Sequence, residues 1–267
     1  MPNRPNEFEA VLSAALKDMA DHGYDSPARV RLWLGKLRTA MVNAGVSEAV
    51  AQRRFRAAMG KIYDKARKPT PARHVGLEPR SVGNIEYHLR PVFEARVSAG
   101  LNLIKLKRTD AIDATVKRFE GWATSLPVIP NYHNDLAKAR KSISKPFRQM
   151  SYEDRRLTID QSHKLLSAIS QTIADQNGAV AGKWRHVHET AYDGRPAHEA
   201  RDGKVYLVRG SWAAERGLVK RRGVDFTDEI TQPAEEPFCR CWWVWLYNLD
   251  DLPPELLTAK GRKANAI

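Results

Sequence analysis

Residues 238–247 read FCRCWWVWLY, and this stretch decides the fold of the C-terminal half. Aromatic and β-branched side chains at this density favour an extended strand. Side chains alternate between the two faces of a strand, so Trp243 and Trp245 share one face and Trp242 lies on the other. Both faces are therefore apolar. The pattern predicts a strand that lies centrally in a sheet or covers an interface.

The residues before this strand predict a hairpin and a helix. Asp202-Gly203 is a dipeptide that supplies the positive φ of a tight hairpin turn, and alternating apolar residues follow it up to Val208. Further upstream, an apolar stripe with helical spacing ends at Asn177-Gly178. Its residues are Leu165, Leu166, Ile169 and Ile173. This half is therefore expected to combine one helix with a short antiparallel sheet.

The first 150 residues predict helices only. Their apolar side chains recur at three- and four-residue spacing, which is typical of amphipathic helices. Ser26-Pro27 has the residue types of a helix start, and Thr109-Asp110 indicates another. Pro91 predicts a kink or a split. We expect roughly six helices and no strand, over about 8–22, 27–44, 48–68, 81–107, 110–126 and 134–149.

These patterns predict an α+β protein of two domains. A mainly helical, basic domain covers residues 1–150, and a small α+β domain covers residues 151–267. The boundary is placed at residues 151–160, which look like a charged bridge with little helical character.

The positive charge of the chain is concentrated in the predicted helical domain. Residues 1–150 hold 27 Lys and Arg against 14 Asp and Glu, whereas the remainder holds 17 of each, so the first part carries the whole net charge of +13. Clustered Lys and Arg favour a polyanion partner because they replace counterions condensed on phosphates. The alternative is a solvated helix face. The candidate DNA-binding residues are Arg53, Arg54, Arg56, Lys61, Lys65, Arg67 and Lys68.

Cysteine usage and hydropathy indicate the compartment. The chain has only two cysteines, Cys239 and Cys241, and the loop between them is too tight for an unstrained mutual disulfide. This favours a reducing environment. No apolar run approaches the roughly 20 residues that span a bilayer, and the N-terminus lacks the apolar core of a signal peptide. We therefore expect a cytoplasmic protein without a membrane partner.

The C-terminal half also contains five nitrogen and sulfur donors that could bind a metal. They are His186, His188, His198, Cys239 and Cys241. Zinc takes four such ligands tetrahedrally, but its usual knuckle spacing is C-x2-C rather than the C-x-C found here. Cysteines in this setting more often pack as small buried apolar residues. The sequence therefore favours a structural role without a cofactor, and zinc is the alternative.

The same segments resemble a known family. Lys183-Trp184, then Asp193 to His198, then Asp202-Gly203, and finally the run from Pro233 to Cys241, are similar in order and spacing to the phage Mu F-like head morphogenesis domain. The resemblance covers about residues 150–248. One departure is the polar motif of the opening helix, where this chain has Thr158, Asp160, Gln161 and Ser162. The motif residues are Trp184, Asp193, Arg195, His198, Cys239, Arg240 and Cys241.

The resemblance implies a minor head protein of a tailed phage or prophage. Such a protein acts in head morphogenesis near the portal, with the portal or major capsid protein as its partner. It would be found in the virion head, and in the host cytoplasm during assembly. A basic helical face would suit non-specific contact with packaged duplex DNA, because phosphate contacts position a protein without reading sequence.

Catalysis has little support in the sequence. His198 lies near Asp193 and Glu199, but no second acid cluster accompanies them. We expect Asp193 and Arg195 to fix a turn and His198 to bond the backbone of the Cys-bearing strand. Two alternatives remain open: a zinc-dependent nuclease or hydrolase that uses the His/Cys cluster, and a non-enzymatic DNA-binding accessory protein.

Overall fold

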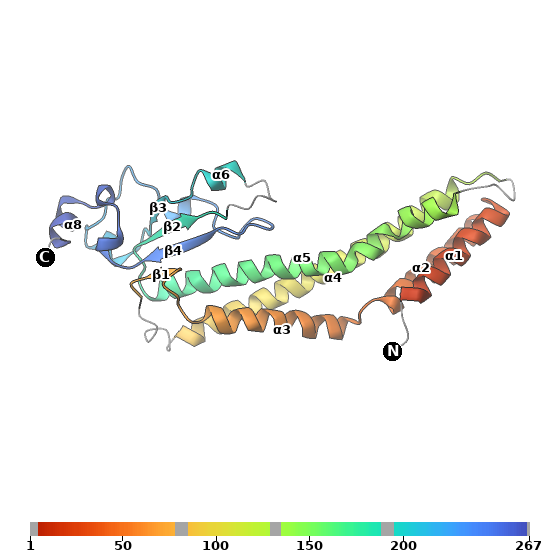
Figure 1. The fold of residues 1–267 in the computed structure, drawn as a ribbon, viewed down its shortest axis with the longest axis horizontal. Coiled ribbons are helices and arrows are strands. Elements are labelled where there is room, and N and C mark those ends of the chain that lie inside the picture. Colours follow the sequence, from red (N-terminus) through yellow and green to blue (C-terminus); the bar gives the residue numbers. More distant parts are fainter. Residues whose placement is uncertain (1–4, 78–84, 129–134, 188–194, 266–267) are drawn as a thin grey trace. The chain divides into compact units, whose positions relative to one another are not determined.

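The computed structural model describes residues 5–77, 85–128, 135–187 and 195–265 and confirms the α+β class. Long helices dominate the first part of the chain, and a small sheet follows in the last third (Figure 1). His188 and Asp193 lie outside the described residues, so the predictions that involve them stay predictions. Among the described residues, no helix combines the length and the apolar composition needed to cross a membrane.

Three helices begin and end close to the predicted positions, and each has a local reason. The Oγ of Ser26 accepts a hydrogen bond from the backbone N–H of Arg29 and so caps α2, which starts at Pro27. The backbone N–H of Gly45 donates to the carbonyl of Met41 at the other end. The bounds are α1 (Pro5–His22), α2 (Pro27–Ala44) and α3 (Glu48–Ala66).

The next two helices are longer than predicted. They are α4 (Glu86–Thr124) and α5 (Leu136–Gln176). Thr109 does not cap a new helix as predicted, because its Oγ1 donates to the carbonyl of Lys105 one turn earlier within α4. Pro91 and Pro146 both lie inside helices without ending them. The predicted bridge at 151–160 is also wrong, since those residues continue α5.

The chain divides into two compact units that differ from the predicted domains. One comprises residues 1–55 and 100–157, and the other comprises residues 56–99 and 158–267. The predicted boundary at residue 150 falls inside α5. Each unit is thus assembled from separate stretches of sequence, because α3, α4 and α5 each contribute one part to each unit.

The first unit is a helical bundle with its own apolar core. Glu9 of α1 accepts hydrogen bonds from Arg140 and Arg148 of α5, which ties the two helices at their surface. Its buried core residues are Phe8, Leu12, Ala15, Leu16, Met19, Val30, Leu37, Met41, Phe119, Ala123, Leu126 and Ile143.

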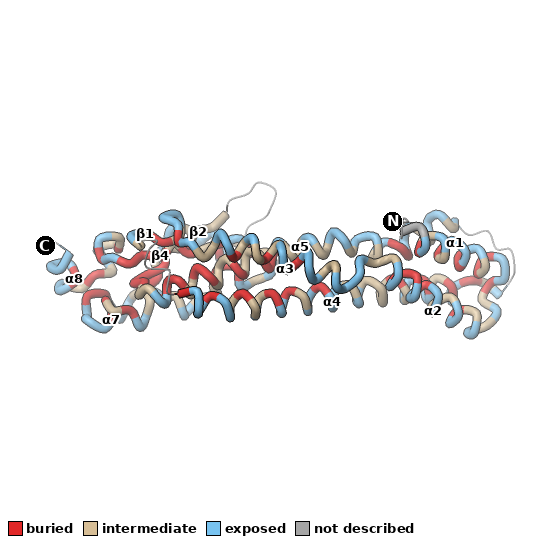
Figure 2. Tube along the Cα trace, turned by 90° about the horizontal axis from the view of Figure 1, so that it is seen from below, coloured by how far each residue is buried: buried red, intermediate tan, exposed pale blue. Residues whose placement is uncertain are grey.

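The second unit joins helical segments to the sheet. Buried side chains recur about once per turn along its part of α4, at Leu89, Phe93 and Val97 (Figure 2). The ring of Phe93 packs against Tyr63 of α3, with ring centroids 5.0 Å apart. This periodicity is what the predicted amphipathic helices require.

The sheet has four strands in the order β1-β4-β2-β3. The strands are β1 (His74–Val75), β2 (Ala181–Arg185), β3 (Val205–Leu207) and β4 (Trp242–Leu246). Strand β4 lies centrally, as predicted. Gly203 has the expected positive φ of 77°, but the predicted tight hairpin turn was wrong, because α6 lies between the end of β2 at Arg185 and the start of β3 at Val205. Two further expectations were wrong. A strand does occur before residue 150, and it pairs with β4 in parallel, so the sheet is mixed.

The two faces of the sheet pack against different layers. Trp243 and Trp245 belong to a buried cluster that includes Ala174 of α5, whereas Leu246 belongs to the opposite cluster. The opposite cluster includes residues of α7 and of the segment that leads to the C-terminal helix. The remaining elements are α6 (Pro196–Glu199), α7 (Trp212–Glu215), α8 (Ala259–Ala264) and the 3-10 turns η2 (Thr227–Glu229), η3 (Leu249–Asp251) and η4 (Pro254–Leu256).

Candidate functional site

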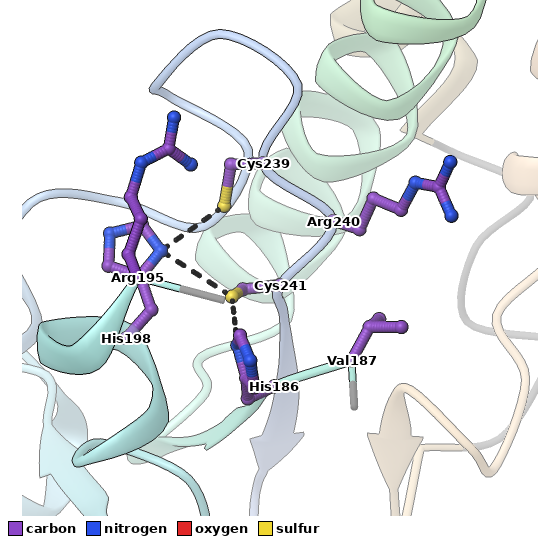
Figure 3. A pocket seen from close by; sticks show the side chains of 7 residues that line it. All are labelled: His186, Val187, Arg195, His198, Cys239, Arg240 and Cys241. Carbon is purple, nitrogen blue, oxygen red and sulfur yellow. Dashed lines mark hydrogen bonds between the residues drawn. The ribbon is translucent and has the colours of Figure 1, made fainter. Parts of the chain in front are cut away.

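Three buried donor side chains from two distant segments meet beside the sheet. The Nδ1 of His198 lies 3.5 Å from the Sγ of Cys239 and 3.6 Å from the Sγ of Cys241 (Figure 3). Their ligand-type atoms all lie within 4.8 Å of one another. His198 is on α6, and both cysteines precede β4. The structure therefore brings one imidazole and two sulfurs to a single point.

A fourth donor approaches from the end of β2. The Nδ1 of His186 lies 3.3 Å from the Sγ of Cys241, although His186 is not within the tighter group of three (Figure 3). Its backbone N–H donates to the Oδ1 of Asp202, 2.9 Å away, so the turn before β3 fixes this part of the chain. The cavity between these side chains measures about 20 Å³. That volume suits an ion or one water and is far below the several hundred Å³ of a substrate pocket.

Strand alternation does not produce this geometry. The predicted strand over 238–247 is shorter, because regular pairing begins only at Trp242. Phe238 has a φ of 59°, a left-handed conformation that costs a residue of this size on the order of 1–3 kcal/mol. The backbone reversal at Phe238 leads directly into Cys239. Both sulfurs nevertheless face His198, while the side chain of Arg240 points away from them (Figure 3).

Arg195 and Glu236 hold the two segments against each other. The guanidinium of Arg195 donates to the backbone carbonyl of Pro237, 2.9 Å away, and forms an ion pair with Glu236. The other ring nitrogen of His198, Nε2, lies 3.8 Å from the same Glu236 carboxylate. Arg195 therefore links the start of α6 to the run before the cysteines, and the predicted role of Asp193 and Arg195 in fixing a turn stays a prediction. His198 instead directs Nδ1 at the cysteine sulfurs, so the predicted bond to the backbone of the strand was wrong.

The run before the cysteines is clamped to α5. The Nζ of Lys164 donates to the carbonyls of Ala234, Glu235 and Glu236, at 2.8, 2.8 and 3.1 Å. One turn earlier on the helix, the buried Asp160 accepts the backbone N–H of Phe238 at 2.6 Å.

A third contact and an internal ion pair complete this clamp. The Oγ of Ser167 donates to the carbonyl of Pro233. The Nζ of Lys164 also lies 3.6 Å from Asp160. Within this α5 clamp (Asp160, Lys164 and Ser167), the charges of Asp160 and Lys164 neutralise each other. The clamp fixes the backbone of the segment that carries the cysteines.

The two cysteines shift each other's pKa in opposite directions. The pKa of Cys239 is lowered to about 5, chiefly because the side chain of Cys241 donates a hydrogen bond to it. The same hydrogen bond, together with burial, raises the pKa of Cys241. The lowered pKa of Cys239 favours its thiolate, the form that acts as a nucleophile or a metal ligand.

Aromatic rings close the cluster on the sheet side. Trp184 is fully buried, and its ring meets His198 edge-on with ring centroids 5.3 Å apart. Trp243 meets Trp184 in the same manner at 5.2 Å. Trp243 and Trp245 are buried, as expected for a core strand rather than a base-stacking platform.

The predicted basic face lies on α3 and just beyond it. Arg53, Arg54, Arg56, Lys61 and Lys65 are exposed on the helix, whereas Arg67 and Lys68 follow its end and are half-buried. Two of the set are engaged by acids: Arg56 pairs with Glu94 at 2.6 Å, and Arg67 lies 3.5 Å from Glu86. Arg53 and Arg54 belong to the first unit, and the other five belong to the second.

Comparison of the chain with models of known families, with curated proteins and with solved structures finds no match. Of the predicted motif, the structure gathers Trp184, Arg195, His198, Cys239 and Cys241, and it places Arg240 on the exposed side of the turn.

The clamp on α5 could not be recognised directly from the sequence. Asp160 stood out only as a departure from the opening-helix motif, and Lys164 and Ser167 did not stand out at all. Their contacts bridge 66 to 78 residues of sequence, which no local spacing rule can reveal. One usable signal was the presence of a Lys four residues after an Asp in a predicted helix, the spacing of an ion pair on one face.

Proposed function

We propose that this protein is a minor head protein of a tailed phage or prophage that acts in head morphogenesis near the portal. The observation that carries the proposal is the convergence of the Mu F-like motif residues. Trp184, His198 and the two cysteines are separated by up to 57 residues of sequence, yet they form one buried cluster. A motif that folds into one structural unit supports a resemblance of fold rather than of isolated residues.

We further propose that α3 contacts duplex DNA through its phosphates. Arg54, Lys61 and Lys65 are exposed and are spaced by seven and four residues, so they share one side of the helix. Such contacts are independent of base sequence. The portal or the major capsid protein would be the protein partner, in the virion head and in the host cytoplasm during assembly.

The dimensions of the His/Cys cluster argue against a nuclease or hydrolase. Cleavage of a phosphodiester needs room for a nucleotide and an open metal position, whereas this cavity holds about 20 Å³. The alternative role, a DNA-binding accessory protein, would use the same basic helix. It differs from a head protein in that the chain would be absent from particles.

The proposal is tested by quantitative mass spectrometry of purified procapsids and DNA-filled heads from cells that express this chain together with its phage. The chain is expected in both, at a small copy number relative to the major capsid protein. A nuclease-treated lysate fraction that lacks particles serves as the control for adventitious co-purification. If the chain is found only in the particle-free fraction, the role in the head is wrong and the accessory role replaces it.

A further inference from the structure

The geometry points to a closed structural zinc site formed by Cys239, Cys241, His198 and His186. This inference is independent of the proposed role in the head, because it rests on the cluster alone. The ligand set is Cys2His2, and the two cysteines have an unusual C-x-C spacing.

The separations between donors are those of ligands around one zinc ion. Bonds of about 2.3 Å to sulfur and 2.0–2.1 Å to nitrogen at tetrahedral angles put a nitrogen and a sulfur ligand about 3.6 Å apart. The Nδ1 of His198 lies 3.5 Å and 3.6 Å from the two sulfurs. A single hydrogen bond would bring the nitrogen close to only one sulfur. Here one nitrogen lies at this distance from two sulfurs, which fits an ion between the three atoms.

His186 supplies the fourth position. Its Nδ1 lies 3.3 Å from the Sγ of Cys241, and Figure 3 shows His186 and His198 both directed at this sulfur from different elements. It stands outside the group of three whose donor atoms lie within 4.8 Å of one another, so its ring must move closer to that group on metal binding. The hydrogen bond from its backbone N–H to Asp202 keeps this residue at the site.

The residues around the ligands match the surroundings of a zinc histidine. A ligating imidazole usually directs its second nitrogen at a carboxylate, which fixes the ring orientation. The Nε2 of His198 faces the carboxylate of Glu236 at 3.8 Å, and Arg195 holds that carboxylate in turn. The α5 clamp fixes the backbone that carries Cys239.

The site is structural rather than catalytic. Four protein ligands leave no position for a water or a substrate, and the cavity of about 20 Å³ has no room for either beside the ion. The ion would cross-link α6 and the end of β2 to the segment before β4, and it would add the free energy of metal binding to that of folding.

The test uses the full chain, purified without a chelating column or chelators. Elemental analysis is expected to find one zinc per chain. Replacement of zinc by Co²⁺ is expected to give tetrahedral d–d bands and thiolate charge-transfer bands. Both signals should be lost in Cys239→Ser and His198→Ala, and His88→Ala, an exposed histidine on α4, should retain them. His186→Ala should keep the thiolate bands and bind zinc more weakly.

A second measurement does not depend on whether the variants fold. The wild-type chain is stripped with a chelator and its thiols are counted with and without added zinc. Two reactive thiols are expected without the metal and none with it, together with a lower apparent Tm of the stripped chain that zinc restores. A chain that is purified without zinc, takes up neither Zn²⁺ nor Co²⁺ and has thiols indifferent to zinc would overturn the site. An unchanged zinc affinity of His186→Ala would contradict the closed, four-ligand form.

Discussion

At the scale of single residues, Gly182 shows how tightly the aromatic layer is packed. A Cβ at this position of β2 would lie 2.9 Å from Cε3 of Trp243 and 3.2 Å from Cζ3 of Trp245. Both rings are buried and have no room to retreat.

Gly182→Ala is therefore expected to lower the free energy of unfolding by about 1–3 kcal/mol through overpacking. The matched control is Gly210→Ala, since Gly210 is exposed and a Cβ there would meet nothing within 4 Å. Chemical denaturation of both variants measures the difference. Equal stability of the two variants would mean that the rings do not pack against β2 as described.

His74 is a second residue whose environment has a measurable consequence. It is buried on β1, with Nδ1 2.7 Å from the hydroxyl of Tyr247 and Nε2 3.3 Å from the Oγ of Ser170. Burial, aided by the neighbouring positive charge of Arg73, lowers the pKa of His74 to about 4.

The folded state therefore loses stability as the pH falls. Between the usual histidine pKa of about 6.5 and the lowered value, the unfolded chain binds the proton and the folded chain does not, so unfolding becomes easier. We expect the protonation of His74 to lower the free energy of unfolding by up to about 3 kcal/mol between pH 7 and pH 4. Denaturation at several pH values should show a shallower loss for His74→Gln. If the free energy of unfolding changes equally with pH in the wild type and in His74→Gln, His74 is not buried in its neutral form.

At the scale of elements, the α5 clamp is the contact that holds the segment carrying the cysteines of the His/Cys cluster. Lys164 is largely buried, pairs with Asp160 and donates to three carbonyls of the run before the cysteines. Removing one partner of a buried pair leaves the other charge uncompensated, which typically costs about 3–5 kcal/mol.

Lys164→Met is thus expected to destabilise the chain by about this amount and to make the thiol of Cys239 more reactive. Lys138→Met is the control, because Lys138 is exposed on the same helix and should change stability by less than about 0.5 kcal/mol. Denaturation and thiol-reaction rates give the two results. An increase in thiol reactivity as small as that of the control would show that the clamp does not hold the cysteines in place.

The basic side of α3 is the element on which the proposed DNA binding depends. Changing Arg54, Lys61 and Lys65 to Gln is expected to weaken binding to duplexes of any sequence. The slope of log affinity against log salt should fall by about one for each phosphate that the variant no longer neutralises. Lys204, Arg222 and Lys263, which are exposed on other elements, form a control triple with the same change in charge. Equal weakening in both triples would indicate a diffuse charge effect instead of a binding face.

At the scale of the whole molecule, the sequence predicted the class of fold and the positions of the early helices, because caps and apolar spacing are local signals. It did not predict that Thr109 and Ser151 lie inside long helices. Thr109 has the residue type of a cap, yet it donates to the preceding turn and the helix continues. Strand β1 is two residues long and shows no alternation, so its pairing with β4 could not be read from the sequence.

The candidate site was predicted in composition and not in geometry. The spacing of Cys239 and Cys241 on an expected strand favoured a role without metal, whereas the backbone reversal at Phe238 and the placement of His198 turn three donors toward one point. The backbone N–H of Phe238 donates to Asp160, which lies 78 residues earlier in the chain. Contacts of such length are set by packing of the whole unit.

A map of the portal vertex from purified particles tests most directly the proposed role of this chain in the phage head near the portal. Electron cryo-microscopy without imposed icosahedral symmetry should show density next to the portal that fits the unit containing the sheet and the His/Cys cluster, with α3 close to DNA in filled heads. A portal vertex fully explained by other proteins, in particles that mass spectrometry shows to lack this chain, would contradict the proposed role.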